Sequence, residues 1–149
     1  MKSIIGISIG LMVFLFAIVP EVFSGEARNK IFTQGEIKSM QETKAIIHTS
    51  FGDITLDFFP ELAPNHVSSF LKLSKKGFYD GTTFHRIVPG FVIQGGDPNS
   101  KSEDRSRHGM GGPGYTLKAE FYNTPHSSGI LAMAGGGYGG RGGGGCVGG

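Results

Sequence analysis

The fold is decided by residues 84–97, which read Phe-His-Arg-Ile-Val-Pro-Gly-Phe-Val-Ile-Gln-Gly-Gly-Asp. The residues on either side of the central Pro-Gly pair are mostly β-branched or aromatic, which predicts two short strands, Phe84 to Val88 and Phe91 to Gln94, joined by a turn. Side chains alternate between the two faces of a strand, so Phe84, Arg86 and Val88 are predicted to share one face of the first strand. Gln94 is then available on the neighbouring strand, and the segment brings a fixed cation close to a side-chain amide.

A lone arginine and a lone glutamine on a strand pair have an ordinary interpretation. Isolated polar residues on sheets usually lie on the surface, so Arg86 could be a solvated charge and Gln94 an amide at a strand end. The whole string is more specific than its parts. It resembles the signature of the cyclophilins, which are peptidyl-prolyl cis-trans isomerases, and every fixed position of the pattern Phe-His-Arg-x-x-x-Gly-Phe-x-x-Gln-Gly-Gly-Asp is matched between Phe84 and Asp97.

The resemblance covers the middle of the chain, from about Ala45 to Ala134. Within it, residues 47–56 are similar to the first hairpin of the compact bacterial type, and residues 63–70 are similar to the start of the family's first helix. The fold that the resemblance implies is mainly β, a closed antiparallel β-barrel with capping helices. We therefore expect a partial cyclophilin-like domain over residues 44–134.

Local sequence patterns predict the same order of elements. Apolar runs separated by Gly and Asp predict a hairpin, and apolar residues at three- and four-residue spacings predict one amphipathic helix. Two lysines followed by a glycine predict the end of that helix, and His66 on the helix is predicted to be exposed. The expected elements are strands at 45–49 and 54–58, a helix at 65–76 followed by Gly77, a loop at 99–114, and strands at 115–121 and 130–134.

Composition limits the number of domains and the classes of partner. A chain of 149 residues with 38% hydrophobic content holds one ordinary domain with end segments. A formal net charge of +2 is too small to indicate nucleic acid as the main partner. The single cysteine, Cys146, excludes an internal disulfide, and the five dispersed histidines have no ligand spacing for zinc. We expect no metal, no cofactor and a monomer.

The N-terminal segment has the features of an export signal. Lys2 is followed by a run of apolar and small residues over 4–19. Small residues before Gly25 suit a signal peptidase, so residues 1–24 are predicted to be the cleaved signal peptide of an exported protein, periplasmic or secreted. The alternative is an uncleaved membrane anchor, although the run is shorter than the ~20 residues of a spanning helix. Residues 25–43 are predicted to be a polar linker with some helical tendency.

The chain changes character after Ala134. Residues 135–149 are almost all glycine, and such a segment buries too little apolar surface to offset the entropy of ordering it, which predicts a disordered tail. Arg and Tyr among glycines also occur in RNA-binding segments, but one arginine gives little support for that function. The family continues here with a polar loop and a Gly-Ser-Gln-Phe-Phe strand, then closing strands and a second helix. The resemblance therefore implies a truncated or frame-shifted domain that is incomplete at its C-terminus, with open sheet edges.

The reaction implied by the resemblance needs no nucleophile. Rotation about an X-Pro bond breaks amide resonance, which sets a barrier of ~18–20 kcal/mol. A cation that donates to the prolyl nitrogen in a partly dry groove favours the twisted state, and an arginine stays protonated and presents rigid donors. By resemblance, Arg86 is the catalytic residue, and proline-containing peptides and unfolded chains are the partners.

The resemblance also implies the residues that would bind substrate. Phe91 would form a wall of the proline pocket, and Gln94 would hold a substrate carbonyl. Val92 and Ala134 would be groove contacts, while His85 would orient the strand that carries the arginine, or would be an ordinary core histidine. Two functions follow from these assignments. One is an extracytoplasmic prolyl isomerase that assists the folding of exported proteins, and the other is a catalytically inactive fragment that binds peptides or acts like a holdase.

Overall fold

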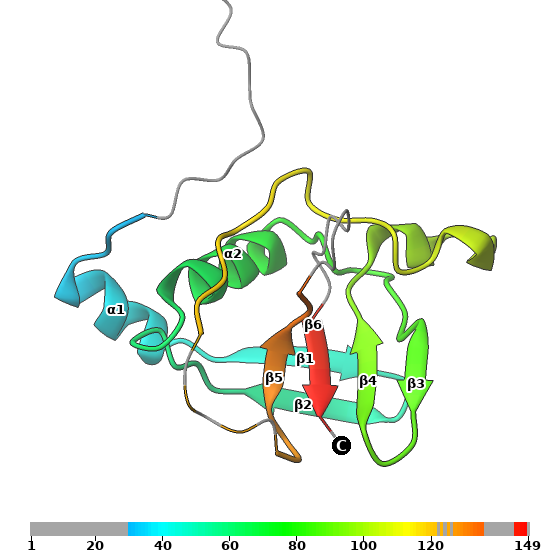
Figure 1. Ribbon diagram of the computed structural model, residues 1–149, viewed down its shortest axis with the longest axis horizontal. Coiled ribbons are helices and arrows are strands. Elements are labelled where there is room, and N and C mark those ends of the chain that lie inside the picture. Colours follow the sequence, from blue (N-terminus) through cyan, green and yellow to red (C-terminus); the bar gives the residue numbers. More distant parts are fainter. Residues whose placement is uncertain (1–29, 122, 124, 126, 136–144, 149) are drawn as a thin grey trace, which may run out of the picture.

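The computed structural model describes residues 30–121, 123, 125, 127–135 and 145–148. The described elements are α1 (Gln34–Gln41), β1 (Ala45–Thr49), β2 (Gly52–Leu56), α2 (Pro64–Lys75), β3 (Arg86–Val88), β4 (Val92–Gly95), the 3₁₀ helices η1 (Pro98–Lys101) and η2 (Arg105–Arg107), β5 (Leu131–Met133) and β6 (Gly145–Gly148). The strands form two antiparallel sheets, the β1-β2 hairpin and a sheet of order β3-β4-β6-β5 (Figure 1). None of the described helices is long and apolar enough to span a membrane.

β1 and β2 form the first predicted hairpin, with a tighter turn than expected. Thr49 pairs with Gly52, which leaves only residues 50–51 to connect the strands. Thr49 Oγ1 donates to the carbonyl of Gly52 at 2.7 Å, and Gly52 has a φ of 123°, a value that favours glycine. The second strand, predicted at 54–58, instead spans Gly52–Leu56 because pairing begins directly after this short turn.

β3 and β4 form the second predicted hairpin, around a turn at Pro89-Gly90. Gly90 has a φ of 71°, and the N–H of Phe91 donates to the carbonyl of Val88 at 3.0 Å. Phe91 therefore belongs to the turn, and β4 begins one residue later than predicted, at Val92.

β3 is shorter than predicted and begins at Arg86 instead of Phe84. The N–H of Thr83 donates to Ser100 Oγ at 2.9 Å instead of joining a strand ladder. The ring of Phe84 packs over Gly95, where an added Cβ would lie 2.9 Å from the ring. The residues before Arg86 are thus bound to the neighbouring loop, so they do not extend the sheet.

α2 confirms the predicted helix and its end. It spans Pro64–Lys75, with the proline in the first turn, and Gly77 beyond its end has a φ of 67°. The cap residue Ala63 has no side-chain acceptor for the free N–H groups at the start. The prediction that His66 is exposed is wrong, because its side chain is only 19% exposed and contacts a distant segment.

That distant segment is residues 115–121, here called the strap. The predicted strand at this position is wrong, since the strap has no regular structure apart from an isolated bridge at Thr116. The strap is fixed to α2 at both ends. The hydroxyl groups of Tyr115 and Ser69 share a hydrogen bond of 2.7 Å, and Glu120 binds the start of the helix. Among the described residues the strap joins no strand ladder, and its side-chain hydrogen bonds go to α2.

Glu120 supplies the helix cap that Ala63 lacks. Its carboxylate accepts the backbone N–H groups of Asn65 at 3.1 Å and of His66 at 3.0 Å, together with Asn65 Nδ2 at 2.8 Å and His66 Nδ1 at 2.6 Å. Burial acts to raise the pKa of Glu120, but these hydrogen bonds outweigh burial and hold that pKa below its ordinary value. The ionised carboxylate therefore joins two segments that are far apart in the sequence.

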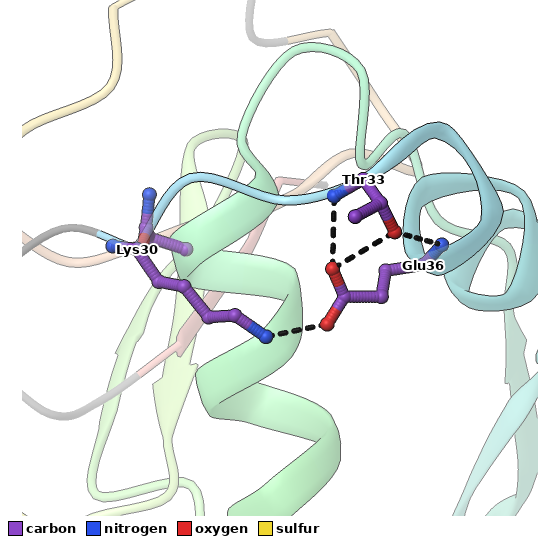
Figure 2. Close-up of polar contacts among 4 residues, drawn as sticks. Lys30, Thr33 and Glu36 are labelled. Atoms are coloured by element: carbon purple, nitrogen blue, oxygen red, sulfur yellow. Dashed lines mark hydrogen bonds and ion pairs between the residues drawn. The ribbon is translucent and has the colours of Figure 1, made fainter.

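α1 lies within the segment predicted as a linker, residues 25–43. Figure 2 shows its start, where the N–H of Thr33 donates to the Glu36 carboxylate at 2.8 Å and the N–H of Glu36 donates to Thr33 Oγ1 at 3.3 Å. The ammonium of Lys30 also binds this carboxylate, and its hydrogen bond is the main cause that lowers the pKa of Glu36 to about 2. The N–H of Lys30 donates to Asn65 Oδ1 at 2.7 Å, so the chain before α1 is attached to α2. The predicted signal peptide lies outside the described residues.

The prediction of a disordered tail over 135–149 is corrected at one place. Gly145–Gly148 form β6, which pairs antiparallel with β4 on one side and with β5 on the other (Figure 1). Ladder hydrogen bonds are made by the backbone, so a glycine-rich segment can occupy this position without large side chains. Residues 136–144 and 149 lie outside the described residues.

The apolar core of the described residues is small. The buried apolar side chains are those of Leu56, Phe58, Leu73 and Val92. Ile87 on β3 remains 64% exposed, and the two sheets do not close into a barrel within the described residues. The structure therefore confirms a mainly β fold with helices at its side, and the incomplete closure agrees with the predicted incomplete barrel.

Candidate active site

The β3-β4 register places the two predicted polar residues opposite each other. Arg86 pairs with Gln94, and Val88 pairs with Val92 at the next position on the same face. Arg86 Nη1 donates to Gln94 Oε1 at 3.4 Å. These four residues define what we call the site face of the sheet. The alternation inferred from sequence is confirmed, and the guanidinium of Arg86 is exposed and makes one long hydrogen bond to the amide of Gln94.

The site face continues across the sheet. Gln94 lies opposite Cys146 of β6, and Cys146 lies opposite Ala132 of β5. Residues directly opposite in a sheet lie on the same face. Ala134, just past the end of β5, is the next position on that side by alternation, and it is half-buried. The topology thus brings Ala134 to the same face as Arg86 although the two are far apart in sequence.

Phe91 and Val92 differ in the exposure of their side chains. Phe91 lies at the end of the turn, its side chain is 66% exposed, and it enters none of the ring pairs found among the described residues. Val92 is on the site face but is only 8% exposed. Of these two side chains, that of Phe91 is therefore the one accessible from solvent.

His85 and Asp97 flank the site residues without sharing their face. His85 is half-buried beside Gly109, and its Nδ1 is buried without a hydrogen-bond partner among the described residues. Asp97 ends the signature and is only 2% exposed. The sequence analysis named His85 but assigned no role to Asp97. The one signal that pointed to Asp97 was its fixed position in the signature, directly after the Gly-Gly pair.

The site offers hydrogen-bond donors and an aromatic surface. Arg86 supplies a permanent cation with planar donors. Since Gln94 Oε1 faces the guanidinium, the amide NH₂ of Gln94 is left to donate to another group. Within the described part of the chain, no group of three or more His, Cys, Asp or Glu residues could hold a metal ion. The arrangement can bind a carbonyl and place a cation beside it.

Comparisons with known proteins agree with this geometry. The family model for cyclophilin-type peptidyl-prolyl cis-trans isomerases matches residues 44–141. A peptidyl-prolyl cis-trans isomerase of Synechococcus elongatus is 50% identical over 92 residues, which are 62% of this chain and 59% of the relative. Peptidyl-prolyl cis-trans isomerase B of Bacillus subtilis is 49% identical over 83 residues, or 54% of this chain and 53% of the relative. The chain therefore spans little more than half the length of these relatives.

Solved structures give the same assignment. A cyclophilin-type isomerase of Cryptosporidium parvum, crystallised in the presence of the dipeptide Ala-Pro, superposes with a TM-score of 0.61 at 31% identity, over 71% of this chain and 67% of that one. A cyclophilin of Hirschia baltica has a TM-score of 0.51 at 22% identity over 80% of this chain and 65% of its own, which supports the fold alone. The signature strands, the family match and these neighbours together show that the chain belongs to the cyclophilin-type peptidyl-prolyl cis-trans isomerases.

Proposed function

We propose that this chain accelerates the cis-trans isomerisation of X-Pro bonds. The observation that carries the proposal is the Arg86–Gln94 hydrogen bond of 3.4 Å across β3 and β4. The uncatalysed reaction takes tens to hundreds of seconds because rotation breaks amide resonance. As the bond twists, the prolyl nitrogen regains a lone pair. A donor fixed at that nitrogen stabilises the twisted state more than the planar one, which lowers the barrier.

Each residue predicted to act in catalysis or to bind substrate has a role in this proposal. Arg86 donates to the prolyl nitrogen, and Gln94 orients the guanidinium through Oε1 while its NH₂ group holds a substrate carbonyl. The exposed ring of Phe91 forms one wall of the proline pocket. Val92 and Ala134 limit the site face beneath and beside the bound peptide. No step requires a proton to leave the protein.

The substrates in this proposal are proline-containing peptides and unfolded chains. The Ala-Pro dipeptide in the Cryptosporidium parvum crystals supports that substrate class. We further propose that the protein works as a monomer after export, in the periplasm or outside the cell, where it assists the folding of exported proteins. The motive for export is the basic start and the apolar run of the first 24 residues. Intact-mass analysis of the exported protein would support this if residues 1–24 were absent, and a full-length mass in the membrane fraction would favour an anchor.

The isomerase proposal is tested by a protease-coupled assay with a proline peptide. Arg86→Ala is expected to lower kcat/KM about 10²–10³-fold, since one positioned donor at the developing charge is lost. Arg105→Ala is the matched control, because Arg105 is an exposed arginine of η2 with no side-chain partner among the described residues. Rates for wild type and Arg86→Ala that are equally slow, no faster than the uncatalysed reaction, would exclude the enzymatic function.

A second function is favoured by the exposed apolar side chains. Ile87 and Phe121 are 64% and 94% exposed, and surfaces of this kind bind unfolded chains without chemistry. In this alternative the chain is a catalytically inactive module that binds peptides or acts like a holdase. Light scattering by an aggregating client protein separates the two functions. Suppression of scattering that is unchanged in Arg86→Ala, without any isomerase activity, supports the binding module.

A further inference from the structure

The β3-β4 hairpin is closed at both ends. One end is the Pro89-Gly90 turn. At the other end the two strands leave the ladder, and their continuations are joined again by buried polar contacts. These contacts define what we call the bracket, whose hydrogen-bonded members are Thr83, Asp97, Ser100 and Gly109. The ring of His85 lies next to Gly109.

The centre of the bracket is the carboxylate of Asp97, which is only 2% exposed. Its Oδ1 accepts the N–H of Asn99 at 2.8 Å, and its Oδ2 accepts the N–H of Gly109 from the far side of the loop. The backbone carbonyl of Asp97 accepts Ser100 Oγ at 2.6 Å, and Ser100 Oγ in turn accepts the N–H of Thr83 at 2.9 Å. A buried carboxylate is costly unless it is hydrogen-bonded, so these donors determine where the loop can lie.

Two glycines show how closely the loop is packed against the bracket. A Cβ placed on Gly109, at a φ of 83°, would lie 3.5 Å from His85 Nε2. A Cβ placed on Gly111 would overlap Asp97 Oδ1. The imidazole of His85 would thus be in ordinary van der Waals contact with a methyl group added to Gly109, the residue whose N–H is bound by Asp97. His85 directly precedes Arg86, and Asp97 follows the β4 strand that carries Gln94.

We propose that Asp97 is a positioning residue of the active site. Its carboxylate holds Gly109 against His85 and so fixes the separation of the two strands at the position of Arg86 and Gln94. This inference rests on the proposed isomerase function, because the positioned pair is the one that would act on the prolyl bond. Displacement of a catalytic group by about 1 Å can lower a rate by about 10²-fold, so a rigid bracket beside the pair has a direct kinetic consequence.

The kinetic test compares Asp97→Asn with Asp104→Asn in the same loop. Both aspartates cap a 3₁₀ helix through Oδ1, but Asp104 is exposed, and its hydrogen bonds among the described residues go to Ser102 and Ser106 of the same loop. Asp97→Asn keeps the shape and loses an acceptor, and we expect kcat/KM to fall roughly tenfold to hundredfold, mainly in kcat. Asp104→Asn is expected to match wild type. Both variants are assayed well below their unfolding temperatures, so that a loss of activity does not arise from unfolded protein.

A double-mutant cycle separates positioning from a general loss of structure. If Asp97 acts through Arg86, then Asp97→Asn should lower activity much less in an Arg86→Lys background than in wild type. Equal fold-changes in both backgrounds would mean that the two residues act independently, and that result would overturn the proposal. If Asp97→Asn does not fold, Ser100→Ala loosens the same bracket more mildly and is expected to show a smaller fall with the same dependence on Arg86.

Side-chain N–H resonances of Arg86 and Gln94 give a readout that does not depend on turnover. Asp97→Asn is expected to shift both sets of resonances, whereas Asp104→Asn leaves them in place. Unshifted resonances in Asp97→Asn would overturn the positioning role even in an active enzyme. Shifted resonances in a chain without isomerase activity would support the positioning role and reject the proposed function, so the two failures are distinguishable.

Discussion

The two hairpins of this protein differ in what holds them. β1 and β2 pair only with each other among the described residues, and Ile46 and Phe51 are 52% and 100% exposed. β3 and β4 are joined by a turn at one end and by the bracket around Asp97 at the other. The polar pairs of the first hairpin, His48 with Asp53 at 2.8 Å and Lys44 with Asp57 at 2.9 Å at the open end, are exposed to water and contribute little. The contacts at the open end of the second hairpin are centred on a buried carboxylate, which is why we expect them to fix two side chains at one distance. The site lies on the hairpin that has such contacts.

After the loss of Arg86 itself, the largest expected change at the second hairpin comes from Gln94→Ala. Arg86 would lose its only side-chain partner among the described residues. A hydrogen bond to a charged group contributes about 1.5–3 kcal/mol, so we expect kcat/KM to fall roughly tenfold to hundredfold. Gln41→Ala at the end of α1 is the control, since Gln41 is exposed and distant in sequence from the site. Full activity of Gln94→Ala would show that the guanidinium needs no orienting partner.

Gly111→Ala tests the packing of the bracket directly. The added methyl group would overlap Asp97 Oδ1, and overpacking of this kind costs about 1–3 kcal/mol of unfolding free energy. Gly35→Ala is the opposite case, because no atom lies within 4 Å of its added Cβ and it sits in α1. It is expected to stabilise the protein by about 0.5–1 kcal/mol. Urea unfolding of both variants measures the difference, and a stable Gly111→Ala protein would contradict the close approach.

The strap gives a pH-dependent contribution to stability. Burial opposes ionisation of Glu120, but its hydrogen bonds from Asn65 and His66 hold its pKa below the unfolded value of about 4.3. A lowered folded pKa means that the stabilisation is complete above about pH 4.3 and is lost as pH falls through the folded pKa. Wild-type unfolding free energy should therefore decrease more steeply in acid than that of Glu120→Gln.

The size of the Glu120 effect at neutral pH is a separate measurement. Glu120→Gln is expected to lower the unfolding free energy by about 1–3 kcal/mol, since two backbone N–H groups at the start of α2 lose their ionised acceptor. Glu103→Gln, an exposed loop variant, serves as the control. Identical acid profiles for wild type and Glu120→Gln would mean that the strap is not held by this carboxylate.

The smallest effect is expected on the first hairpin. Ile46→Thr keeps the β-branched shape at a position that is 52% exposed, so the unfolding free energy should change by no more than about 0.5 kcal/mol. Removal of an exposed apolar side chain next to an open strand edge should still reduce aggregation on heating. Ile47→Thr, on the less exposed face of the same strand, should be clearly more destabilising. Equal stabilities for the two variants would contradict the assigned faces.

Sequence predicted what depends on neighbours in the chain. Period-two alternation and a Pro-Gly turn were enough to place Arg86 and Gln94 on one face, and a terminal glycine was enough to end α2. These signals are local because the physics behind them, backbone geometry and strand pleating, acts within a few residues. The same locality explains why strand limits differed by only one or two residues.

Contacts between distant segments were not predictable in this way. The strap looked like a strand because its residues suit one, but Glu120 and Tyr115 bind α2 instead of a neighbouring strand. The sequence analysis assigned no role to Asp97, and its burial follows from a loop that returns to it at Gly109. The glycine content of residues 135–149 predicted disorder, because a glycine-rich segment loses much conformational entropy when it is ordered. Composition could not show that β4 and β5 provide backbone hydrogen-bond partners for β6.

The most direct test of the account is the isomerisation rate of an Ala-Pro peptide, measured by exchange spectroscopy with catalytic amounts of protein. Wild type and Arg105→Ala are expected to raise the rate of exchange between the cis and trans forms of the peptide equally. Arg86→Ala is expected to lower the catalysed exchange rate by about 10²-fold or more. Exchange that is equally fast with Arg86→Ala would contradict the claim that the guanidinium held by Gln94 is what turns the prolyl bond.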